Sequence, residues 1–233
     1  MKHITILFLL FFPYLAIATQ YTNAPTSVTK DIRQQLSTMP IKSIQTTPIN
    51  GLYEIQTGDQ IFYTDKTGQY LINGHMFDTN TRADITAQRL AEINRINWSD
   101  LPLENAIVSG PENGLKMAVF TDPDCPYCKR LEQSLQNEHE LRIYTFLFPL
   151  TQLHPDAYEK SKSIWCAKNQ HQAMQDVMLK GKTLPKATCK TPIDANIQLA
   201  DKLHVRGTPT IFAEDGRRYT GGDLKTWLKQ GAK

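Results

Sequence analysis

Two cysteines separated by two residues constrain this chain more than any other feature of its sequence. Cys125 and Cys128 stand where an apolar, strand-like run, residues 115–120, gives way to a helix-like run, residues 129–136. The start of a helix offers free N–H groups and the positive end of the helix dipole, which both favour an anion. Thiols in such Cys-x-x-Cys settings have pKa values of roughly 3.5–7.5. We therefore predict that Cys125 is an exposed, attacking thiolate and that Cys128, one turn later, resolves mixed disulfides.

A zinc site and a structural disulfide are the alternative interpretations of this motif. Tetrahedral zinc needs two further ligands, usually a second Cys-x-x-Cys or a histidine pair, and the sequence offers neither. A disulfide across two residues closes too small a loop to stabilise the chain much. A strand that leads into a helix opening on Cys-x-x-Cys is instead typical of redox-active thioredoxin-like domains. We predict a redox site without metal or cofactor.

Length and charge bound the remaining possibilities. The chain has 233 residues, which suits one or two domains, and a formal net charge of +3. No block of basic residues stands out, so the sequence does not indicate a nucleic-acid partner.

The first residues have the pattern of a secretory signal peptide. Lys2 precedes an almost wholly apolar run, residues 4–17, and a small-x-small cleavage signal ends at Ala18. An uncleaved membrane anchor is the alternative, but this run is shorter than the roughly 20 residues that span a bilayer. We predict a signal peptide over residues 1–18. An even count of four cysteines in an exported chain favours disulfides.

Residues 19–80 predict a small domain made of one helix and an antiparallel sheet. Apolar residues recur at helical spacing after Thr26 and Ser27, which are candidate caps, and Pro40 ends the helix. Short alternating segments with turn residues between them then run to residue 78. A domain of this size buries little surface and is often stabilised by oligomerisation.

Helical spacing returns over residues 81–99, which we interpret as a linker helix. From residue 100 to 233 the pattern is that of an α/β domain, with strand-like segments at residues 106–108, 115–120 and 141–147. Residues 155–180 predict two helices, which would form an insertion in that domain. The chain as a whole is therefore expected to combine α+β and α/β architecture.

The other two cysteines lie within this helical insertion and just after it. Cys166 falls in its first helix and Cys189 in the loop that follows it. A disulfide between them would hold the insertion to its loop and stabilise the fold by ~3 kcal/mol in the chain-entropy model. Two unpaired buried thiols are the alternative.

The last part of the chain contains a second candidate site segment. Thr191 and Pro192 are expected to start a helix as its cap and first residue. Thr208 and Pro209 then stand at the head of a buried strand and are a candidate cis peptide, the alternative being an ordinary trans proline. In the cis geometry, the Thr208 backbone could pair with an extended substrate beside Cys125. A helix over residues 223–230 is expected to close the domain.

Taken together, these motifs resemble the periplasmic disulfide isomerases of the DsbC/DsbG type. The resemblance covers nearly the whole mature chain and includes Phe-Thr-Asp before Cys-x-Tyr-Cys, the segment Ile-Trp-Cys-Ala-Lys at residues 164–168, and Gly-Thr-Pro at residues 207–209. It implies a thioredoxin fold with a helical insertion, and an N-terminal domain that forms a V-shaped homodimer. It further implies that Cys166 and Cys189 form a structural disulfide. The substrate-contacting residues would be Pro126, Tyr127, Thr208 and Pro209.

The same resemblance implies a function and partners. The protein is expected to reshuffle wrong disulfides in misoxidised exported proteins of the periplasm, and to be kept reduced by a membrane thiol reductase of the DsbD type. A periplasmic dithiol oxidase or reductase, and a holdase chaperone with a redox site, are the alternatives.

Two positions depart from the family pattern. Pro126 stands where DsbC-like motifs usually have Gly, and the dipeptide between the cysteines tunes the redox potential. Val119 occupies the position of the acid that thioredoxins bury six residues before the first cysteine. Proton transfer from Cys128 would then need water or another group. We expect the nearby Asp122 and Asp124 to cap the helix or to face solvent.

Overall fold

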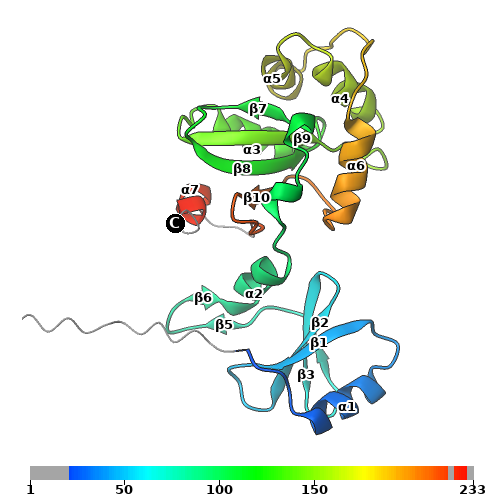
Figure 1. Cartoon of the computed structure of the whole chain (residues 1–233), viewed down its shortest axis with the longest axis vertical. Coiled ribbons are helices and arrows are strands. Elements are labelled where there is room, and N and C mark those ends of the chain that lie inside the picture. Colours follow the sequence, from blue (N-terminus) through cyan, green and yellow to red (C-terminus); the bar gives the residue numbers. More distant parts are fainter. Residues whose placement is uncertain (1–20, 220–222, 230–233) are drawn as a thin grey trace, which may run out of the picture. The chain divides into compact units, whose positions relative to one another are not determined.

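A computed structural model describes residues 21–219 and 223–229 of the chain, so the predicted signal peptide lies outside the described residues. The chain divides into two compact units, residues 1–74 and residues 75–233, each of which is described by itself (Figure 1). Across the described ranges, no helix is both long and apolar enough to cross a membrane.

The first unit is one helix packed on an antiparallel sheet, which confirms the expected architecture. Helix α1 (Thr26–Gln35) is followed by strands β1 (Ile41–Thr46), β2 (Leu52–Thr57), β3 (Gln60–Asp65) and β4 (Leu71–Ile72), paired in sequence order. Ile32 of α1 packs on Ile44 and Ile55 of the sheet, and all three are buried. The predicted caps are wrong, because Pro25 holds the N-cap position and no side chain caps α1.

The second unit opens with a short hairpin and the predicted linker helix. Strands β5 (Phe77–Asp78) and β6 (Ala83–Asp84) pair with each other, and α2 (Ile85–Ile93) follows. Helix α2 is much shorter than the predicted residues 81–99. Its start is fixed by the Asp84 side chain, which accepts the Ala87 N–H, and Asn94 is its C-cap. Two single-turn helices, η1 (Trp98–Asp100) and η2 (Leu103–Asn105), then lead into the next sheet.

A four-stranded mixed sheet forms the centre of the second unit (Figure 1). Its strands are β7 (Ile107–Ser109), β8 (Leu115–Thr121), β9 (Leu141–Leu147) and β10 (Thr210–Ala213), in the order β10-β8-β9-β7. Strands β8 and β9 are parallel, and the two edge strands are antiparallel to their neighbours. The predicted strand ends agree with β8 and β9 to within a residue.

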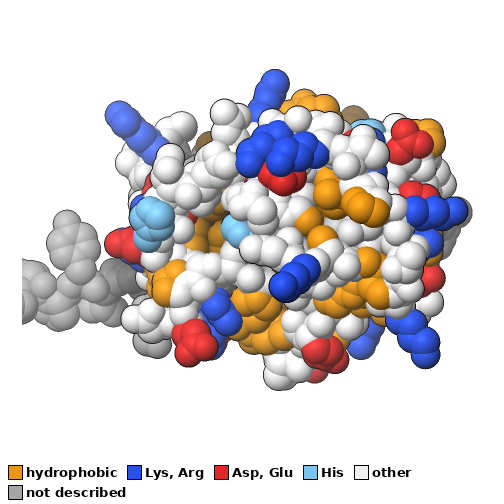
Figure 2. Space-filling view, turned by 90° about the horizontal axis from the view of Figure 1, so that it is seen from above, with side chains coloured by type: hydrophobic (Ala, Val, Ile, Leu, Met, Phe, Trp, Pro, Cys, Tyr) orange, Lys and Arg blue, Asp and Glu red, His pale blue; other side chains and the backbone are white. Residues whose placement is uncertain are grey.

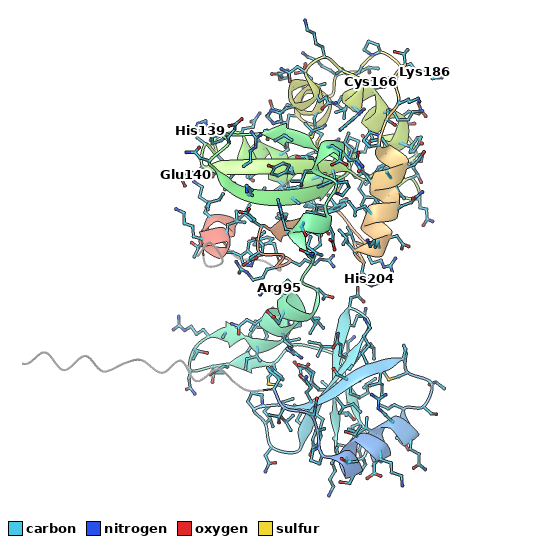
Figure 3. All side chains as sticks on the ribbon, in the orientation of Figure 1. Arg95, His139, Glu140, Cys166, Lys186 and His204 are labelled. Atoms are coloured by element: carbon cyan, nitrogen blue, oxygen red, sulfur yellow. A yellow bond between two sulfur atoms is a disulfide. The ribbon has the colours of Figure 1, made fainter. Side chains whose placement is uncertain are left out.

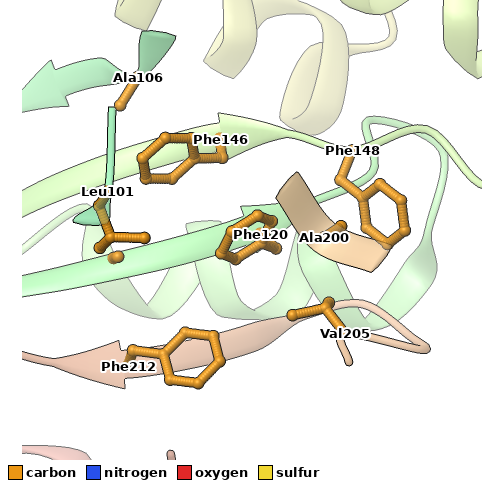
Figure 4. Packing of buried hydrophobic residues seen from close by; sticks show 9 residues of the cluster. Leu101, Ala106, Phe120, Phe146, Phe148, Ala200, Val205 and Phe212 are labelled. Carbon is orange, nitrogen blue, oxygen red and sulfur yellow. The ribbon is translucent and has the colours of Figure 1, made fainter. Parts of the chain in front are cut away.

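Alternating residues of β8 serve two different cores, because successive strand side chains point to opposite faces. Phe120 lies in an aromatic cluster with its ring centroid 5.1 Å from that of Phe146 and 6.1 Å from that of Phe212 (Figure 4). Met117 and Val119 belong to the core of the other face, with Leu135 of helix α3 (Pro126–Leu135). The sheet is therefore buried on both sides, as its apolar strands predicted.

The remaining helices surround this sheet. Helices α4 (Ala157–Trp165) and α5 (Gln170–Lys180) confirm the predicted insertion, and α6 (Ile193–Lys202) and α7 (Leu224–Lys229) follow. Helix α6 starts one residue later than expected: Pro192 is its N-cap, and no side chain caps it, so Thr191 is not the cap. On the face drawn in Figure 2, lysine, arginine and acidic side chains are interspersed.

Candidate active site

The Cys-x-x-Cys motif lies where β8 passes into α3. Cys125 is the N-cap residue of α3, and its carbonyl oxygen accepts the Lys129 N–H at 3.1 Å. Pro126 is the first residue of the helix, where its missing N–H leaves no intrahelical bond unmade. The structure thus places Cys125 at the positive end of a helix, as the spacing predicted.

Cys125 is not exposed, which corrects the expectation from the sequence. The residue is only 5% exposed, and its Sγ donates to the Thr208 carbonyl oxygen at 3.4 Å. The Thr208–Pro209 peptide bond is cis, which confirms the candidate that the sequence singled out. The segment before β10 therefore covers the sulfur and presents backbone beside it.

Cys128 lies deeper than Cys125. It is 1% exposed, and its Sγ accepts the Asp122 N–H at 3.5 Å. Burial raises the pKa of Cys128 to about 11, although the Asp122 amide and the hydroxyls of Thr121 and Thr208 partly oppose that shift. Both cysteines are unpaired, so the structure represents the reduced dithiol.

Asp122 is the functional candidate that sequence reasoning undervalued. It is fully buried, and its carboxylate accepts the backbone N–H groups of Asp124, Cys125 and Leu150 and contacts the His154 ring. Of the two expectations for Asp122, that it caps the helix or faces solvent, the second is wrong, while its Oδ1 does accept the N–H of Cys125, the N-cap residue of α3. Its contact with His154 joins residues 32 positions apart, so no local spacing could have revealed it.

The surface of the motif carries an ion pair and an exposed ring. Asp124 accepts two bonds from Lys160 Nζ of α4, both 2.8 Å long. Tyr127 is 66% exposed, and the guanidinium carbon of Arg130 lies 5.7 Å from its ring centroid. An exposed aromatic ring thus lies on the surface between the two cysteines of the motif.

A disulfide joins Cys166 to Cys189, the pairing that the resemblance implied. Cys166 is the C-cap of α4 rather than a residue inside it, and Figure 3 labels it in the helical insertion. The bond holds the loop after α5 against the end of α4. The insertion in turn packs on the redox motif, because Ile164 and Met174 share a core with both active-site cysteines.

An apolar residue, Val119, occupies the position at which thioredoxins bury an acid. Val119 is 3% exposed and packs among the apolar residues on the α3 side of β8. Asp122, in the loop between β8 and α3, is the buried carboxylate of the motif. Within the part of the chain that the structure describes, no group of three or more histidine, cysteine or acidic side chains could hold a metal ion.

These features define the class of protein: a thioredoxin-like domain with a reduced dithiol at the start of a helix. The sequence matches the thioredoxin-like domain family over residues 103–229 and the family described as disulfide bond isomerase protein N-terminal domain over residues 19–87. The chain belongs to the DsbC family of thiol:disulfide interchange proteins, and it is a thiol-disulfide oxidoreductase.

Two curated relatives and one solved structure illustrate this similarity. The probable thiol:disulfide interchange protein DsbC of Bordetella avium is 36% identical over 88% of this chain and 74% of the relative. DsbC of Escherichia coli K12 is 31% identical over 82% of this chain and 81% of its own. The crystal structure of a disulfide interchange protein from Neisseria gonorrhoeae has 35% identity and a TM-score of 0.53, covering 57% of this chain and 99% of its own.

Proposed function

We propose that the protein is a disulfide isomerase that uses Cys125 as its nucleophile and Cys128 as its resolving thiol. The observation that carries this proposal is the placement of Cys125 at the start of α3, with its Sγ 3.4 Å from the Thr208 carbonyl oxygen. A substrate strand lying beside the Thr208 backbone would bring its own sulfur next to Cys125. This arrangement supports the roles expected of Thr208 and Pro209.

The proposed reaction exchanges one disulfide for another. The Cys125 thiolate attacks a substrate disulfide, forms a mixed disulfide and expels one substrate thiolate. That thiolate can attack elsewhere in the substrate and finally displace Cys125, so the substrate leaves with a new pairing and the dithiol stays reduced. Alternatively Cys128 attacks Cys125, which frees the substrate as a thiol and leaves a Cys125–Cys128 disulfide.

A pocket with both apolar and polar side chains supports a polypeptide substrate. It has a volume of about 650 Å³ and lies between the loop after β9 and helix α6. Phe148, Leu153 and Ile197 line it, and it reaches Val205 and Arg206, which precede the Thr208 segment. Leu153 is 71% exposed. Misoxidised proteins expose apolar segments, and such a segment would contact the apolar side chains of this pocket.

The cellular setting belongs to the same proposal. We assign the protein to the periplasm, with residues 1–18 as its signal peptide and residues 19–80 as a dimerisation domain. The domain-family match at residues 19–87 supports the last of these, the dimerisation domain. Misoxidised exported proteins are the proposed substrates, and a membrane thiol reductase of the DsbD type is the proposed source of electrons that returns the dithiol to its reduced state.

Refolding of scrambled ribonuclease tests the isomerase assignment. The reduced protein should restore ribonuclease activity under conditions in which spontaneous reshuffling is slow, and Cys125→Ser should not. Cys128→Ser should retain part of the activity, because isomerisation through Cys125 alone does not consume the dithiol. No gain of the native protein over Cys125→Ser would refute the proposal.

A dithiol oxidase is the second candidate, and the Pro126-Tyr127 dipeptide is the observation that favours it. The intervening dipeptide tunes the reduction potential, and a more oxidising potential would turn the same site toward disulfide donation. Equilibration of the Cys125–Cys128 pair with glutathione separates the two functions. A potential near those of strong oxidants, about −120 mV, would favour the oxidase over the isomerase.

A further inference from the structure

The polar centre beneath the redox motif is the carboxylate of Asp122. Oδ1 accepts the N–H groups of Asp124 at 2.7 Å and of Cys125 at 3.2 Å. Oδ2 accepts the Leu150 N–H at 2.7 Å and lies 3.0 Å from His154 Nδ1. Four bonds thus converge on one fully buried side chain, which joins the start of α3 to the loop after β9.

The same residue also contacts the buried sulfur. The Asp122 backbone N–H points to Cys128 Sγ at 3.5 Å, while its side chain holds the N–H of Cys125. Any movement of Asp122 would therefore displace a donor that faces Cys128. A donor to a sulfur stabilises the thiolate form over the thiol.

His154 is the ionisable side-chain partner of this carboxylate. A buried carboxylate is costly unless it is hydrogen-bonded and its charge is offset. The His154 side chain is 22% exposed, so the ring joins the buried carboxylate to solvent. Histidine changes its charge between about pH 5 and 8, and only the protonated ring offsets the carboxylate charge.

Among the described residues, the other charged side chains near Asp122 and His154 do not contact the Asp122 carboxylate. Lys160 of α4 is engaged with Asp124 at 2.8 Å. Asp156, at the start of α4, is exposed and its side chain does not cap that helix. Helix α3 contributes Cys128 and Lys129, which is half-buried, and Cys125 is its N-cap residue. Among the described contacts of Asp122, His154 is the one from a side chain that can carry a positive charge.

We propose that Asp122 and His154 form a positioning pair that sets the rate at which Cys128 resolves the mixed disulfide. The carboxylate fixes the amide that faces Cys128, and the imidazole, 3.0 Å from Oδ2, holds the carboxylate in place. The inference rests on the proposed function of the dithiol and assigns to Asp122 and His154 a part in its second step.

That step needs no further reactant. Cys128 loses its proton to solvent, and the resulting thiolate attacks the Cys125 sulfur of the mixed disulfide. The bond between Cys125 and the substrate sulfur breaks, the Cys125–Cys128 bond forms, and the substrate thiolate leaves and takes a proton. The dithiol is oxidised and the mixed disulfide is reduced.

A two-phase reaction with the small aromatic disulfide 5,5′-dithiobis(2-nitrobenzoate) tests the inference on the full-length reduced protein. The first coloured thiolate is released when Cys125 attacks, and the second when Cys128 resolves the mixed disulfide. Asp122→Asn keeps the size of the side chain but presents an amide group to one of the donors. It should slow the second phase about tenfold or more, and the first phase less, because a bond to a charged group is lost.

His154→Gln provides the pH test. The ratio of the native second-phase rate to that of His154→Gln should be largest near pH 5 and fall as pH rises to about 8, because that is the range in which histidine side chains in general change their charge. A purely structural role would change the rate without changing this pH dependence. Asp156→Asn, which removes an exposed carboxylate from the same region, is the matched control and should leave both phases unchanged.

The outcomes separate the inference from the proposed function. Native second-phase rates with native pH dependence in both variants would overturn the inference, as would an Asp156→Asn effect as large as that of His154→Gln. If circular dichroism shows that Asp122→Asn does not fold, His154→Gln alone decides. A native protein with no more first phase than Cys125→Ser would instead refute the proposed function itself.

Discussion

The sulfur of Cys125 lies 3.4 Å from the carbonyl oxygen of Thr208, although 83 positions separate the two residues in the chain. This contact explains how a cysteine at the start of a helix can be only 5% exposed. In the proposed mechanism a substrate approaches the sulfur along the Thr208 backbone, so that binding and attack share one surface. Cys128 is buried more deeply and is only 1% exposed.

The difference between the two thiols should be visible in alkylation. Because burial raises the pKa of Cys128 to about 11, only about one molecule in ten thousand carries its thiolate at pH 7. Brief treatment of the reduced protein with iodoacetamide at pH 7 should therefore add one label, at Cys125, as read by peptide mass spectrometry. Cys125→Ser should take up almost none. Equal labelling of Cys128 at pH 7 would contradict the burial of its sulfur.

The same shift predicts how the stability of the reduced protein depends on pH. The pKa of the Cys128 thiol is raised from 9.0, its ordinary value, to about 11 in the folded protein. Between these two pH values the unfolded chain releases the Cys128 proton while the folded protein retains it. The stabilisation is therefore present below pH 9 and is lost as pH rises to about 11, by about 3 kcal/mol from this group. Urea unfolding under reducing conditions should show this loss relative to Cys128→Ser. Identical pH profiles for the two proteins would exclude the shift.

Gly216 should be intolerant of a side chain because the segment after α2 packs directly on it. The Ile96 N–H donates to its carbonyl oxygen at 2.9 Å, and Arg95, labelled in Figure 3, donates to the Asp215 carbonyl oxygen at 3.1 Å. A Cβ at Gly216 would lie 1.9 Å from the Ile96 carbonyl oxygen.

Gly216→Ala is therefore expected to destabilise the second unit by about 3 kcal/mol, from the left-handed backbone and the clash together. Gly181→Ala is the matched control, since Gly181 also has a positive φ but no atom within 4 Å of the added Cβ. It should cost about 1 kcal/mol. Equal urea midpoints for the two variants would show that the segment after α2 moves away from the added Cβ without loss of stability.

Removal of the second disulfide should weaken the fold but leave the exchange chemistry in place. The Cys166–Cys189 bond spans a sequence separation of 23, for which the chain-entropy model gives ~3 kcal/mol. The double variant Cys166→Ser/Cys189→Ser should lose about that much free energy of unfolding in urea. Its release of the first aromatic thiolate by Cys125 should stay near the native rate. A variant with native stability would mean that the bond constrains little of the unfolded chain.

Much of the fold followed from local patterns. The apolar runs that became β8 and β9 were long enough to set their own boundaries, and the proline after Cys125 indicated the first turn of α3. Helix limits were less accurate where caps decided them. Helix α2 starts at the Asp84 cap, and α1 and α6 begin without the side-chain caps that their sequences suggested.

By itself the sequence determined the redox motif, its strand-to-helix setting and the separate small sheet domain, because each depends on residues within a few positions of one another. Only the tertiary structure decided that Cys125 is covered by the Thr208 segment and that Asp122 is buried against His154. Those contacts join residues that are far apart in the chain, and the bonds of Asp122 go mostly to backbone N–H groups. Backbone donors are the same for nearly every residue type, so such bonds leave no pattern in a sequence.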